Sequence, residues 1–114
     1  MKKEYEQDKK KVFSLFRKTK KPVIFLSHNV PYNTRLDKIN NPKSPLNGGH
    51  FGSIIVREAV EKFQPPLCIG GHMHENFGKT LIGKTLVFNA GFGSNVNIFL
   101  DFDGKLRKFN FWSS

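Results

Sequence analysis

Apolar positions along the chain follow a helical period in two segments and an extended pattern in the others. Residues 4–19 have apolar side chains at helical spacing that cluster late, which predicts a helix. Ser53 is a candidate N-cap for a second helix ending at Phe63, before a Pro-Pro pair. Its expected packed side consists of Ile54, Ile55, Ala59 and Val60.

Short apolar runs predict the strands. Residues 23–26 are continuously apolar and predict a strand buried on both faces, and residues 67–69 predict a second strand. Residues 80–82 and 85–88 flank Gly83-Lys84, which suits a type II′ hairpin. The segment between the first strand and the second helix, residues 29–52, is polar and too long for a simple connector.

A second hairpin is predicted to close the chain, with a type I′ turn at Asp103-Gly104. This turn implies one cross-strand register over residues 95–112, in which one face becomes more apolar away from the turn. That end is expected to lie in the core. The expected pairs are Phe102–Lys105, Leu100–Arg107, Ile98–Phe109 and Val96–Phe111.

The order strand, long loop, helix, strand has a consequence for the histidines. Such a crossover makes the two strands parallel. His28 follows the first strand, and the second ends in Gly70-Gly71-His72-Met73-His74. Parallel strands end at the same edge of a sheet, where ligands of open α/β folds bind. The sequence therefore predicts that His28, His72 and His74 converge, as metal ligands would.

The crossover helix should begin at the same edge. Its first N–H groups, at Gly52 and Ser53, together with Gly48-Gly49-His50, could bind an anion. The glycines at 70 and 71 are expected to allow a sharp turn and close approach to a ligand. Each feature also has a simpler explanation: a solvent-exposed turn for the paired histidines, and an ordinary loop residue for His50.

Other polar residues are expected to play smaller parts. Asp37 and Glu75 are expected at the surface, although either could orient a ligand histidine. Asn89-Ala90-Gly91 is most simply a turn, and Cys68 lies inside an apolar strand and is expected to pack there.

Composition narrows the function classes. The formal charge is +10 over 114 residues, and residues 1–21 hold nine Lys or Arg against three acids. Such a field attracts polyanions, but the basic segment has the pattern of the solvated face of a helix, so sequence-specific nucleic-acid binding is not expected. One cysteine and no long apolar run favour a soluble protein of the cytoplasm, without a membrane partner.

Several of these motifs, in this order, resemble the calcineurin-like metallophosphoesterases, most closely the small prokaryotic branch. The matching segments are the Ser27-His28-Asn29-Val30-Pro31 run, the Gly49-to-Ser53 run that opens a helix, the 70–75 run and the 86–91 run, within residues 10 to 95. The resemblance implies that His28 and His72 bind one metal and that His74 binds another. It also implies hydrolysis of a phosphate ester by two divalent ions, which could be Mn, Fe, Zn or Co.

The chain departs from that family in its first half. The family's Asp-x-His, Gly-Asp and Gly-Asn-His motifs, which supply the bridging carboxylate and most ligands of the first metal, do not occur here. The chain is therefore expected to be one α/β (α+β) unit, residues 1–114, forming the C-terminal half of a four-layer αββα sandwich. One βαβ crossover is followed by two hairpins. The missing N-terminal half or a self-associated copy would complete it, and the chain alone is expected to be inactive.

The sequence leaves several properties open. It identifies neither the catalytic residues, nor the phosphate-ester substrate, nor the metal. An alternative function is a non-catalytic metal- or anion-binding or assembly module that keeps the fold.

Overall fold

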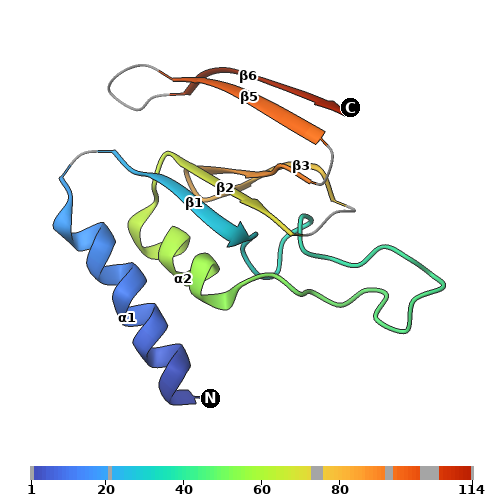
Figure 1. Cartoon of the computed structure of the whole chain (residues 1–114), viewed down its shortest axis with the longest axis horizontal. Helices are drawn as coiled ribbons and strands as arrows, with labels where there is room; N and C mark the ends of the chain where they lie inside the picture. The colour runs from blue at the N-terminus through green and yellow to red at the C-terminus, as the bar shows by residue number, and fades with distance from the viewer. Residues whose placement is uncertain (1, 21, 73–75, 92–93, 101–105, 114) are drawn as a thin grey trace.

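The computed structural model describes residues 2–20, 22–72, 76–91, 94–100 and 106–113. The chain is mixed α/β, and the predicted order of elements is correct (Figure 1). His74, Glu75 and the turn at Asp103-Gly104 lie outside the described residues. The elements are α1 Lys2–Lys18, β1 Ile24–Asn29, α2 Ile54–Phe63, β2 Leu67–Gly71, β3 Gly78–Ile82, β4 Thr85–Asn89, β5 Ser94–Leu100 and β6 Leu106–Ser113.

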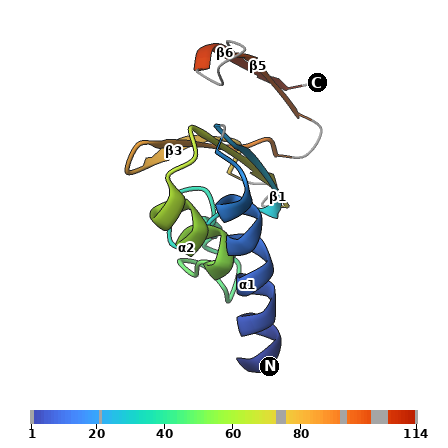
Figure 2. The ribbon, with the colours of Figure 1, turned by 90° about the vertical axis from the view of Figure 1, so that its left-hand side faces the viewer.

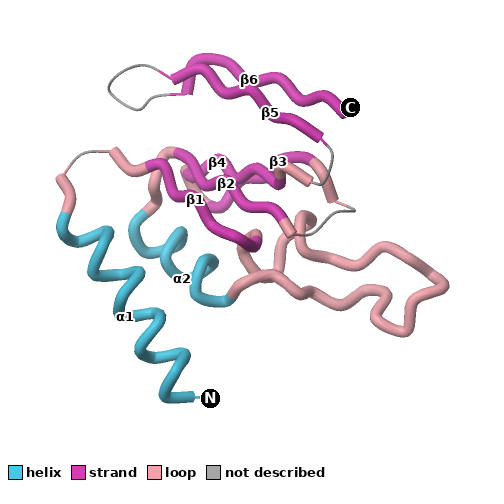
Figure 3. The backbone as a smooth tube through the Cα atoms, viewed as in Figure 1, coloured by secondary structure: helices cyan, strands magenta, loops and turns pink. Residues whose placement is uncertain are grey.

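Four of the strands form one mixed sheet with the order β1-β2-β4-β3. β1 and β2 are parallel, as the crossover predicts, and β4 is parallel to β2. Both helices lie on one side of this sheet, and the β5–β6 hairpin lies as a separate two-stranded layer on the other side (Figures 1, 2 and 3). Among the described helices, none has the length and apolar character needed to cross a bilayer.

Helix α2 begins and ends where its capping residues predict. Ser53 has extended backbone angles, and its side chain accepts a hydrogen bond from the Val56 N–H at 3.2 Å. The expected packed side is wrong at its first position, because Ile54 is 51% exposed while Val56 is buried. The buried residues Val56, Ala59 and Val60 follow helical spacing, and Ile54 lies off the face that they form.

Helix α1 packs on its neighbours mainly through the phenylalanines of its second half, while Tyr5 and Lys9 of its first half contact Glu58 of α2. Phe16 stacks on Phe63 of α2 and meets Phe25 of β1 edge-on, with ring centroids 4.8 and 5.0 Å apart. Phe13 is buried against Phe63. The aromatic residues of α1 thus bind it to α2 and to the sheet edge at β1.

The two faces of β1 differ, which corrects the prediction of a strand buried on both sides. Phe25 packs against the buried core on the helix side. Ile24 and Leu26, which alternate with it, are 41% and 71% exposed. A continuous apolar run cannot reveal whether a second layer covers the outer face. Here the described residues leave the outer face of β1 largely open.

The first hairpin has the predicted pairing at its turn, whereas the second keeps the predicted register only away from its turn. Ile82 pairs with Thr85 around Gly83-Lys84, and Gly83 has φ of 59°, as the predicted turn requires. In the second hairpin the expected pairs Val96–Phe111 and Ile98–Phe109 are present. Leu100 pairs with Leu106 instead of Arg107, because the register shifts between Phe99 and Leu100. The expected pair Phe102–Lys105 lies outside the described residues.

Candidate metal centre

His28 lies in an irregular part of β1. Leu26 pairs with Ile69 and Asn29 pairs with Gly71, so β1 has one residue more than β2 between these pairs. Such a bulge breaks the strict alternation of side chains and redirects them. His28 is exposed at this point, at the carboxyl end of the strand.

His72 lies at the carboxyl end of the neighbouring strand β2 and has a left-handed backbone, with φ of 70°. Histidine tolerates this conformation better than most residues, but it is still uncommon. The His28 and His72 ring centroids are 4.9 Å apart, with the planes tilted by 46°. The two predicted ligand histidines are therefore brought together, and both remain solvent-exposed.

The glycines before His72 have roles different from those expected. A Cβ on Gly70 would lie 2.7 Å from the Asn29 carbonyl oxygen, whereas a Cβ on Gly71 would meet only the His28 carbonyl oxygen, at 3.8 Å. The close approach of β1 therefore requires glycine at position 70. The sharp change of direction occurs at His72 itself.

The donor set at this edge is small. His74, the third predicted ligand, lies outside the described residues. Within the part of the chain that the structure describes, no group of three or more His, Cys, Asp or Glu side chains could hold a metal ion. His28 and His72 form a pair of imidazoles that fits one metal ion incompletely, because a structural zinc site has four ligands and a catalytic one three.

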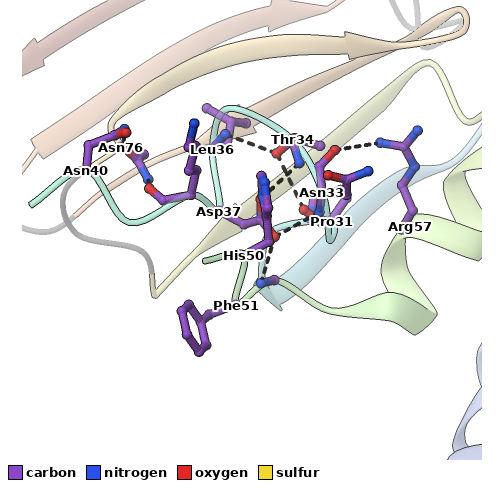
Figure 4. A network of polar contacts seen from close by, with 12 residues as sticks. Pro31, Asn33, Thr34, Leu36, Asp37, Asn40, His50, Phe51, Arg57 and Asn76 are labelled. Atoms are coloured by element: carbon purple, nitrogen blue, oxygen red, sulfur yellow. Dashed lines mark hydrogen bonds and ion pairs between the residues drawn. The ribbon is translucent and has the colours of Figure 1, made fainter. Parts of the chain in front are cut away.

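Asp37 organises the long loop between β1 and α2 (Figure 4). Its side chain is completely buried. One carboxylate oxygen accepts hydrogen bonds from the Thr34 N–H at 2.9 Å and from His50 Nδ1 at 2.6 Å. The other accepts from the Asn33 and Gly52 N–H groups at 2.8 and 3.0 Å. The carboxylate thus ties both ends of the loop to each other.

The expectation that Asp37 is a surface acid is wrong. Burial by itself raises the pKa of the Asp37 carboxyl, but the hydrogen bonds from His50 and from three backbone N–H groups outweigh it, and the pKa lies below its ordinary value. The sequence offers one signal for this burial, since the apolar residues Leu36 and Ile39 bracket Asp37 in an otherwise polar loop. Asp37 orients His50, and not His28 or His72.

The predicted anion site at the start of α2 is not supported at the positions named for it. The Gly52 N–H donates to Asp37, and the Ser53 N–H donates to the Val30 carbonyl at 2.8 Å. The Gly48 and Gly49 N–H groups donate to carbonyl oxygens of Ile39 and Leu46. These donors are occupied because the loop folds back on itself. His50 remains available, since its side chain is 26% exposed.

Asparagine side chains connect this loop to the segments that carry the histidines. Asn29, next to His28, donates to the Phe51 carbonyl at 2.9 Å. Asn76, four residues after His72, donates to the Lys38 carbonyl at 2.6 Å, and Asn89 donates to the Asn76 carbonyl at 2.9 Å. Asn89 is fully buried and also accepts from the Gly91 N–H, so the predicted turn at 89–91 is pinned by its side chain.

Cys68 belongs to the core, as predicted. It is fully buried among apolar residues of the helix-side core. Burial raises the pKa of its thiol to about 12, so the thiolate that would bind a metal or attack a substrate is strongly disfavoured. The described chemistry at this edge therefore belongs to imidazoles and to Asp37.

Comparison of the chain with protein-family models, with curated proteins and with solved structures gave no match.

Proposed function

We propose that this chain contributes metal ligands to a phosphoesterase, a hydrolase that cleaves a phosphomonoester or phosphodiester at a dinuclear metal centre. The single observation that carries the proposal is the His28–His72 ring pair, 4.9 Å apart at the ends of two parallel strands. The motifs of this chain resemble those of the calcineurin-like metallophosphoesterases, and this resemblance implies that the two histidines bind a metal ion. On this proposal, His28 and His72 hold one ion, and His74 holds the other.

The fit of a metal to the pair is chemical as well as spatial. Imidazole nitrogens bind Mn, Fe, Zn and Co at roughly 2 Å, so two ligands of one ion must lie within a few ångströms of each other. Both rings are exposed, and their described contact is with each other. This arrangement leaves a ring nitrogen on each histidine for a metal ion.

The remaining ligands must come from elsewhere, and we propose that a second polypeptide segment supplies them. That segment is either the N-terminal half of a four-layer αββα sandwich or another copy of this chain. The exposed apolar side chains on the outer face of β1, Ile24 and Leu26, are consistent with such a covering layer. Bound divalent ions would lower the pKa of water and neutralise phosphate charge. The single cysteine suits a reducing compartment, so we propose a cytoplasmic location.

Hydrolysis of bis-p-nitrophenyl phosphate with Mn²⁺ tests this proposal. The 114-residue chain alone is expected to hydrolyse it no faster than buffer with Mn²⁺, because one histidine cannot hold the other ion. Joined to a polypeptide that carries the Asp-x-His, Gly-Asp and Gly-Asn-His motifs, the chain should become active, and His72→Ala should abolish the gain. An active joined protein that is insensitive to His72→Ala would refute the assigned role of the pair.

A second candidate function is a non-catalytic metal-binding or assembly module. The observation that favours it is the donor set, which within the described residues never reaches three ligands. This module would bind Zn²⁺ through His28 and His72 yet gain no hydrolysis when joined to the motif-bearing polypeptide. The same experiment therefore separates the two candidates.

A further inference from the structure

The hydrogen bonding of the His50 side chain is typical of a proton-transfer residue. His50 is separate from the ligand pair, the two proposed metal ligands His28 and His72. Its Nδ1 lies 2.6 Å from an oxygen of the buried Asp37 carboxylate. An ionised carboxylate only accepts hydrogen bonds, so Nδ1 must carry a proton. The neutral ring is then fixed as the Nδ1–H tautomer, and Nε2 is the nitrogen that gains and loses a proton.

The His50 ring is partly exposed, and the Tyr32 ring lies edge-on to it with the centroids 6.0 Å apart. The His50 side chain is 26% exposed, and no hydrogen bond from the described residues reaches its Nε2. Figure 4 shows the His50 and Asp37 side chains next to each other within this network. A buried acid that orients a partly exposed imidazole is the arrangement that proton donors and acceptors need in catalysis.

Hydrogen bonds attach the His50 segment to both histidine-bearing segments. His50 forms an antiparallel bridge with Lys38, whose carbonyl accepts from Asn76, beyond His72 in the chain. The next residue, Phe51, accepts from Asn29, the neighbour of His28. The loop is therefore fixed to the sheet edge that carries the two ligand histidines, from both sides.

We infer that His50 donates the proton to the leaving group of the phosphate ester and that Asp37 is its positioning residue. This inference rests on the proposed function. A water oxygen forms a bond to phosphorus while the bond from phosphorus to the leaving oxygen breaks. The leaving oxygen takes the proton from Nε2, and the water releases one proton to solvent. Nδ1 stays protonated throughout, and Nε2 is later reprotonated from solvent.

The test compares two monoesters that share the phosphoryl group, p-nitrophenyl phosphate and phenyl phosphate. The enzyme is the joined protein described above. p-Nitrophenolate leaves without a proton, whereas phenolate benefits from one. In His50→Gln, kcat for phenyl phosphate should fall by roughly 10²- to 10⁴-fold, while kcat for the nitrophenyl ester changes only a few-fold. Lys43→Ala, an exposed position in the same loop, should leave both rates unchanged. Equal losses on the two esters, or no loss on either, would overturn the inference.

A second measurement works without turnover. ¹H–¹⁵N NMR of the 114-residue chain at alkaline pH should show His50 as the Nδ1–H tautomer, and Asp37→Asn should remove that preference. A wild-type His50 found as the Nε2–H tautomer would overturn the inference by itself. A joined protein without any turnover would instead overturn the proposed function, and the inference with it, so the two failures are distinguishable.

Discussion

The histidines at one edge of the sheet occur in two contrasting environments. His28 and His72 face each other at 4.9 Å, exposed and without a described carboxylate beside them. His50 is fixed by a fully buried carboxylate that also holds three backbone N–H groups. A metal ligand needs a free nitrogen and an open approach, whereas a proton donor needs a fixed tautomer. On the two proposals above, the neighbours of each histidine suit the same side chain to a different task.

The largest effect is expected from Asp37→Asn. Each carboxylate oxygen accepts two N–H groups, and an amide would set its own NH₂ group against two of them. Removing one partner of such a buried charged network costs about 3–5 kcal/mol. Urea unfolding should show this loss, with Lys43→Ala, an exposed position in the same loop, as a control near zero. A loss below about 1 kcal/mol would mean that the carboxylate does not organise the loop.

Gly70→Ala, in the strand that leads to His72, should lower the stability of the fold clearly, but by less than Asp37→Asn. The new methyl would lie 2.7 Å from the Asn29 carbonyl oxygen, on a backbone that cannot easily move. Such overpacking costs about 1–3 kcal/mol, measurable by thermal unfolding. Gly71→Ala is the matched control, because its nearest atom is at 3.8 Å. Equal stability of the two variants would contradict the close contact between β1 and β2.

Acid should weaken the Asp37 network and thereby lower the stability of the fold. Because the folded-state pKa of Asp37 is lowered, its contribution is fully present above the ordinary value of 3.8 and is lost as pH falls through the folded pKa. The free energy of unfolding should therefore fall in this acidic range in the wild type, and fall less in Asp37→Asn. Parallel pH dependences in both proteins would show that other groups dominate acid unfolding.

His72→Asn tests the ligand pair with little effect on stability, because asparagine tolerates the left-handed backbone at this exposed position. Calorimetric titration with Zn²⁺ should show saturable but weak binding to the wild-type chain, lost in His72→Asn and in His28→Asn. His50→Gln should bind Zn²⁺ as the wild type does. Loss of binding in His50→Gln would remove the distinction between the two environments.

The smallest effect is expected far from both environments, on helix α1. Lys10 and Lys11 are exposed, and surface charges contribute little to stability. Their joint change to Gln should leave the melting temperature nearly unchanged. Lys9 differs, since it lies 2.7 Å from Glu58, so adding Lys9→Gln should lower stability by up to about 1 kcal/mol. A large drop for Lys10 and Lys11 would indicate that this face is covered by a partner.

Local sequence patterns determined much of this molecule. The crossover between two apolar runs predicted parallel strands, and with them the meeting of His28 and His72. Ser53 and Gly83-Lys84 predicted a cap and a turn, because such choices depend on a few adjacent residues. These predictions succeeded where the interaction range was short or the topology left one solution.

Only the tertiary structure decided how the polar loop is used and which faces are covered. Asp37 is buried because donors thirteen and fifteen residues away, at His50 and Gly52, fold back onto it. In the same folded loop, the N–H groups that were predicted to bind an anion donate to oxygens of the chain instead. Hydrophobic periodicity does not predict such contacts. The sequence predicts Ile24 and Leu26 as core residues, yet both are exposed, because their burial requires a second layer packed on the outer face of β1. Periodicity records that a side chain is apolar, whereas its burial depends on what the rest of the fold brings against it.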